Sequence, residues 1–138
     1  MQILSLIYPM ATLVLLTAFM ISFMLVLRVK AVRTRKLSPR YFKLNEGGDV
    51  PKQLTAVTQN YNNLLELPIL FYAVCILAVI LNKSTEYFIY HAWAFVILRI
   101  IHSYIHITYN HIIHRLLVFG ASCLVLISMW VKVVLLVS

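Results

Sequence analysis

The sequence is poor in charge, and acidic residues are the scarcest: 4 of its 138 residues are Asp or Glu, against 12 Lys and Arg. Charged residues make up 12% of the chain and hydrophobic residues 62%, whereas roughly a quarter of a soluble domain is charged. A soluble domain needs a polar surface around its core, and this chain has too few polar residues to provide one. The composition therefore excludes a soluble protein and indicates an integral membrane protein.

Glycine and cysteine are also rare, which excludes several kinds of site. The 3 glycines are Gly47, Gly48 and Gly120, so no glycine-rich loop is available to bind a phosphate group. The 2 cysteines, Cys75 and Cys123, lie in apolar segments and lack the spacing of a metal or redox motif. We interpret both as small buried hydrophobic residues.

Long apolar segments dominate what is present. Four of them reach the ~20 residues that a helix needs to cross the hydrocarbon layer, and none shows the ~10-residue alternating pattern of a membrane β-barrel. The sequence predicts one all-α transmembrane domain, residues 1–138, built as a four-helix bundle with helices at about 3–27, 54–81, 87–109 and 116–136. The first span has no basic segment before it and no cleavage site after it, so we expect it to be retained.

Basic residues are concentrated between the first and second spans. Residues 28–53 contain eight lysines and arginines, whereas the connection between the second and third spans contains only Lys83. The positive-inside rule therefore predicts that the 28–53 loop, which we expect to be irregular, is cytoplasmic and that both termini lie on the opposite side. We attribute the net charge of +8 to topology and to anionic lipid headgroups, and not to nucleic acid. A short domain without a targeting signal favours a bacterial inner membrane.

Polar residues inside two of the spans follow helical spacing. Those of the second span are Thr55, Gln59, Asn62, Asn63 and Glu66, and those of the third are Arg99, His102, His106 and Asn110. Steps of three and four residues place each set on one face of a helix, and both sets lie in the cytoplasmic half of the membrane. An intramembrane charge needs a partner, so we predict that Glu66 and Arg99 meet in the bundle interior, with Asn63 and His102 completing the hydrogen bonds.

Three interpretations of these polar residues remain open from their pattern alone. An ion pair could only fix the register of the helices, with no ligand. The number of polar groups favours instead a polar pocket that opens toward the cytoplasmic headgroups and includes Arg115. A metal site is the third reading, because His102 and His106 lie one helical turn apart, as do His111 and His114. The chain has only 5 histidines, fewer than membrane di-iron enzymes need, so we expect no metal.

The chain resembles the MAPEG family, the membrane-associated proteins of eicosanoid and glutathione metabolism, over essentially its whole length. The resemblance rests on four spans, a basic segment after the first, Asn63-x-x-Glu66 followed by Pro68 in the second, and Arg99-x-x-His102 in the third. It implies a homotrimer of four-helix protomers that binds glutathione, as a co-substrate, between subunits near the cytoplasmic side. It also implies a glutathione-dependent transferase or peroxidase, similar to microsomal glutathione transferases, acting on a lipophilic electrophile or lipid hydroperoxide.

The resemblance also implies roles for individual residues. The implied glutathione site contains Arg28, Asn63, Glu66, Arg99 and His102, with His106 one turn further along, and the implied catalytic residue is Arg115. Arginines suit the two carboxylates of glutathione, and Glu66 suits its ammonium group. A positive charge at Arg115, beside the sulfur, would lower the pKa of the glutathione thiol and favour the reactive thiolate.

Three positions depart from the family pattern. Asn62 stands where some members have an arginine, and His106 and Phe119 stand where tyrosines are usual. The alternative is therefore a non-catalytic trimer, either structural or lipid-binding, with a repurposed polar pocket. Its arginines would bind a phosphate as readily as a carboxylate.

Overall fold

The computed structural model describes residues 2–44 and 48–137, with side chains from residue 6 onward apart from residue 44. This part of the chain is entirely helical apart from its connections. Its helices are α1 (Gln2–Arg33), α2 (Tyr41–Leu44), α3 (Lys52–Ile80), α4 (Glu86–Ile107) and α5 (Ile112–Val137). Four of them are long and apolar enough to cross a membrane, which confirms the predicted all-α architecture with four spans.

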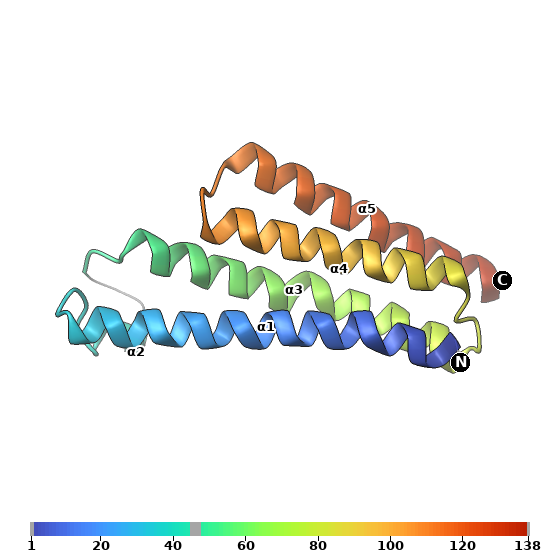
Figure 1. Ribbon diagram of the computed structural model, residues 1–138, viewed down its shortest axis with the longest axis horizontal. Helices are drawn as coiled ribbons and strands as arrows, with labels where there is room; N and C mark the ends of the chain where they lie inside the picture. Colours follow the sequence, from blue (N-terminus) through green and yellow to red (C-terminus); the bar gives the residue numbers. More distant parts are fainter. Residues whose placement is uncertain (1, 45–47, 138) are drawn as a thin grey trace.

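The four long helices run alternately in opposite directions (Figure 1). The N-terminus of α1, the α3–α4 connection and the end of α5 lie at one end of the molecule, and α2 lies at the other, toward which the α4–α5 turn also points. Within the described residues α3 and α4 each contact the other three long helices, whereas α1 and α5 do not contact each other. The α3–α4 pair is therefore the centre of the bundle, with α1 and α5 packed on either side.

The segment expected to be an irregular loop is partly helical. α1 continues to Arg33 instead of ending near Leu27, because no glycine or proline interrupts it there. It ends in a left-handed turn at Arg35 (φ 52°), where the amide of Lys36 bonds the carbonyl of Ala31 at 3.0 Å, the pattern of a Schellman cap. The basic end of α1 is thus a rigid helix that extends past the predicted span.

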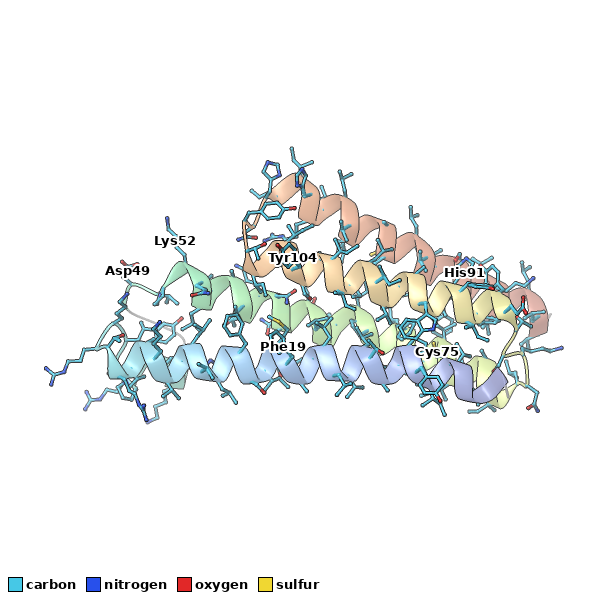
Figure 2. All side chains as sticks on the ribbon, viewed as in Figure 1. Phe19, Asp49, Lys52, Cys75, His91 and Tyr104 are labelled. Atoms are coloured by element: carbon cyan, nitrogen blue, oxygen red, sulfur yellow. The ribbon has the colours of Figure 1, made fainter. Side chains whose placement is uncertain are left out.

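The core changes from apolar to polar along the bundle axis. Toward the α3–α4 connection it is aromatic and aliphatic: Phe71 stacks on Phe95 with ring centroids 4.6 Å apart, and both side chains are fully buried. Cys75 is buried in this half, far from Asp49 and Lys52 at the α2 end (Figure 2). Toward the α2 end, α4 buries four polar side chains that begin with Arg99, and α3 buries one, Asn60, between the apolar Val57 and Leu64. The polar half of the core defines the place of the candidate site.

Candidate functional site

Five polar side chains are buried together where α3 and α4 pack. Arg99, His102, Ser103 and His106 of α4 are between 0% and 2% exposed, and Asn60 of α3 is 0% exposed. Ser103 donates a hydrogen bond from its Oγ to Oδ1 of Asn60 at 3.2 Å, which joins the two helices. We call these residues the buried polar cluster. Polar atoms at this depth need partners, because neither water nor lipid satisfies them.

Only one nitrogen of the Arg99 guanidinium has a hydrogen-bond partner in this cluster. Its Nη2 donates to the backbone carbonyl of Asn63 at 3.5 Å, while its Nε and Nη1 are buried without a partner among the described residues. The ring of Phe119, on α5, covers the guanidinium, with its centroid 5.5 Å from Cζ of Arg99 and 5.8 Å from the ring of His102. A π face stabilises a cation but does not neutralise it. Within the part of the chain that the structure describes, the cluster therefore carries a buried positive charge without a counter-charge.

The predicted ion pair between Glu66 and Arg99 in the bundle interior is wrong. Glu66 is exposed on the surface of α3, whereas Arg99 is fully buried and bonds the carbonyl of Asn63 instead. Helical spacing shows which residues share a face, but it does not show toward which neighbour the face points. The face of α3 that meets α4 contains Asn60, which lies about 120° around the helix from Glu66 at 100° per residue.

The outward face of α3 is a regular seam of its own. Its members are separated by alternate steps of four and three residues: Thr55, Gln59, Asn62, Glu66, Ile69, Ala73, Ile76 and Ile80. All of them are exposed apart from Ala73, which is half-buried. This spacing is typical of a helix that packs along another helix. We call this face the α3 seam; its half nearer the start of the helix is polar and its other half is apolar.

A polar cavity lies between the end of α1, α2 and the start of α3. Its volume is about 340 Å³, and its polar lining residues are Arg28, Thr55, Thr58, Gln59 and Asn62. The guanidinium of Arg28 stacks over Phe42, with Cζ 5.4 Å from the ring centroid, and its Nε is buried without a partner among the described residues. One cation surrounded by hydroxyl and amide groups suits an anionic, hydrogen-bonding small molecule. We call this space the α1–α3 cavity.

Arg115 is held by the α4–α5 turn. Its Nη1 donates to Oδ1 of Asn110 at 2.8 Å, and Asn110 adopts a left-handed conformation (φ 45°) that asparagine tolerates better than most residues. The side chain of Arg115 is half-buried and lies within electrostatic range of His102 and His106. The turn thus places a second cation beside the buried polar cluster.

The structure does not bring all of the predicted site residues together. Arg99, His102 and His106 form most of the buried polar cluster, with Arg115 beside them, and Arg28 lines the α1–α3 cavity. Asn63 is half-buried and donates from Nδ2 to the carbonyl of Gln59 at 3.0 Å, and Glu66 lies on the α3 seam. Among the described residues, no three potential metal ligands of the His, Cys, Asp and Glu types lie together.

Sequence reasoning missed Asn60 and Ser103, although their spacing from neighbouring residues indicated that both face the core. Asn60 lies three residues after Val57 and four before Leu64, both buried and apolar, so it belongs to the inward stripe of α3. Ser103 lies four residues after Arg99 on the buried side of α4. A lone polar residue on an apolar stripe indicates a hydrogen bond between helices.

One of three comparisons with known proteins finds a match. The model of the MAPEG family matches residues 6–135, nearly the whole chain. No curated protein matches the chain, and no solved structure matches it. Together with the four apolar helices, the family match identifies an integral, multi-pass membrane protein.

Proposed function

Because the chain belongs to the MAPEG family, we propose that it is a membrane-embedded, glutathione-dependent transferase or peroxidase whose second substrate is a lipophilic electrophile or a lipid hydroperoxide. The observation that carries this proposal is the group of three cations toward one end of the bundle, Arg28, Arg99 and Arg115, none of which has an acidic partner among the described residues. Glutathione brings two carboxylates and, at the reactive stage, a thiolate. Each of these anionic groups matches one of the three cations.

The same proposal includes a homotrimer with the sites between subunits. The α3 seam has four exposed polar side chains: Thr55, Gln59 and Asn62 also line the α1–α3 cavity, and Glu66 follows one turn further along the helix. In an assembly these side chains would lie between protomers, where Glu66 is available to the ammonium group of glutathione. The buried polar cluster and the α1–α3 cavity lie on either side of α3. A second protomer packed on α3 would therefore complete a site that one protomer provides only in part.

Each of the proposed site residues has a role in binding glutathione or in stabilising its thiolate. Arg28 and the amides of the α1–α3 cavity hold one carboxylate, and Asn63 and Glu66 orient the peptide. Arg99 supplies positive charge at the buried end of the proposed glutathione site, and His102 and His106 supply hydrogen-bond donors beside it. Arg115 stabilises the thiolate, which glutathione supplies as the nucleophile. The apolar surroundings exclude water and admit an oily second substrate from the bilayer.

The proposed orientation follows the distribution of basic residues. The end of α1, α2 and the start of α3 carry eight lysines and arginines between residues 28 and 53. We place this end in the cytoplasm, where glutathione is abundant, and both chain termini on the opposite side of a bacterial inner membrane.

The first test is calorimetric binding of glutathione to the purified protein in detergent, with thiolate absorbance recorded in parallel. Replacing Glu66 with glutamine is expected to weaken binding about tenfold, because the neutral amide loses the ion pair with the ammonium group. Glu86→Gln is the matched control, since Glu86 is exposed at the other end of the bundle, in the first turn of α4. Equal affinity of the wild-type protein and Glu66→Gln would refute the role of Glu66.

One observation favours the second candidate, a non-catalytic lipid-binding or structural trimer. Arg99, His102 and His106 are at most 2% exposed, and Phe119 covers two of them, so a ligand reaches them only if this ring moves. A protein that forms a stable trimer, binds no glutathione at millimolar concentration and retains a lipid through purification would support this alternative over the enzyme.

A further inference from the structure

An open groove runs along the outer side of α1 near the end of the helix. Its volume is about 530 Å³, and it is lined by Leu25, Val26, Val29, Lys30, Arg33 and Thr34. The apolar residues come first along the helix and are about half exposed or more. The two cations follow: Lys30 lies one helical turn after Val26, and Arg33 lies one turn after Val29. The groove is thus apolar at its deep end and positively charged at its outer end.

A smaller hollow continues from this groove toward the start of α3. It has a volume of about 140 Å³, shares Lys30 and Thr34 with the groove, and adds Lys36, Pro51 and Gln53 to the lining. Among the described residues that line the two spaces, none is acidic. Lys30 therefore lies where the groove meets the smaller hollow.

We propose that this α1 groove binds one anionic phospholipid, with an acyl chain along Leu25, Val26 and Val29 and the phosphate at Lys30 and Arg33. The order of the lining residues matches the order of the groups in such a lipid. Long basic side chains at the end of a span extend toward the headgroup region, which places both cations at phosphate depth. The glycerol and headgroup would extend into the smaller hollow, beside Lys36 and Gln53.

Charge complementarity favours a lipid over a second copy of the chain. The whole sequence has 4 acidic residues, of which Glu46 lies outside the described residues. Glu66 lies within the span of α3 and Glu86 at the opposite end of the bundle. Asp49 lies at the same end as the groove (Figure 2), where it stands among eight lysines and arginines between residues 28 and 53. Another protomer therefore has too little negative charge to neutralise this face, whereas an anionic lipid supplies it directly.

The test is titration of the delipidated full-length protein with phosphatidylglycerol or with phosphatidylcholine of the same acyl chains, followed by native mass spectrometry. Each basic residue near the membrane surface contributes about fivefold to binding of an anionic lipid, so Lys30→Gln/Arg33→Gln is expected to weaken phosphatidylglycerol binding about thirtyfold. The matched control, Arg40→Gln/Lys43→Gln, removes the same charge at the same end from exposed residues outside both hollows. It should change binding less than about threefold.

A second variant tests the acyl-chain part of the groove without changing charge. Val26→Trp fills the apolar end and is expected to weaken phosphatidylglycerol binding about tenfold, the equivalent of roughly two buried methylene groups. Equal weakening by the two double variants would show general charge attraction and overturn the proposal. Equal binding of phosphatidylcholine would also overturn it. A Val26→Trp variant with an altered oligomeric state and unchanged lipid binding would identify another protomer as the occupant.

Discussion

Arg115→Ala is expected to lower glutathione-dependent turnover at least about a hundredfold while the protein still assembles normally. Removing one preorganised donor from a developing anion costs roughly 10²–10³ in rate in other enzymes. Here the donor is a full positive charge, half-buried and fixed by Asn110 at 2.8 Å. The measurement is kcat/KM with a lipophilic electrophile, together with thiolate absorbance of the bound glutathione. Both signals should fall together.

Three further variants separate the charge of Arg115 from its position. Arg115→Lys keeps the charge and should retain part of the thiolate signal. Asn110→Gly removes the oxygen that holds Arg115, and glycine accepts the φ of 45° at this position, so we expect a smaller loss than in Arg115→Ala. Arg40→Ala removes an exposed arginine just before α2 and should leave turnover unchanged. A full thiolate signal in Arg115→Ala would exclude the proposed role.

The four spans were predictable because their evidence is contained within single segments of sequence. Length and continuous hydrophobicity specify a transmembrane helix with little help from tertiary structure. The end of α1 was less predictable. Residues 28–33 are basic, which suggested a loop, but lysine and arginine are good helix formers and nothing breaks the helix before Arg35. Charge there marks the membrane surface and not the end of the helix.

The candidate site was predicted as a set of residues but not as an arrangement. The stripe of α4 that contains Arg99 and His102 does face inward, as expected. The polar stripe of α3 does not, because its apolar continuation, Ile69 and Ile76, could equally well face a partner or the core. Only packing distinguishes the two faces, and α3 has a second inward stripe that includes Asn60. The outward position of Glu66 is informative in itself, since it separates the acid from Arg99 and from the core.

Arg99→Met is expected to raise the thermal stability of the ligand-free protein and to weaken glutathione binding about thirtyfold or more. The guanidinium is 0% exposed and two of its nitrogens have no partner among the described residues. Replacing poorly compensated buried charge with an apolar side chain of similar length stabilises other proteins by about 1–4 kcal/mol. Loss of a buried charge that pairs with a ligand carboxylate costs about 2–5 kcal/mol of binding energy. Stability and binding should therefore change in opposite directions.

The opposite signs make this variant more informative than a simple loss of binding. Arg33→Met is the control, because Arg33 is exposed and its replacement should change the melting temperature little. A lower melting temperature for Arg99→Met, with glutathione binding intact, would show that Arg99 is neutralised inside the assembled protein and serves its architecture. A higher melting temperature with lost binding would show that the protein tolerates an unpaired charge in its core because the ligand needs it.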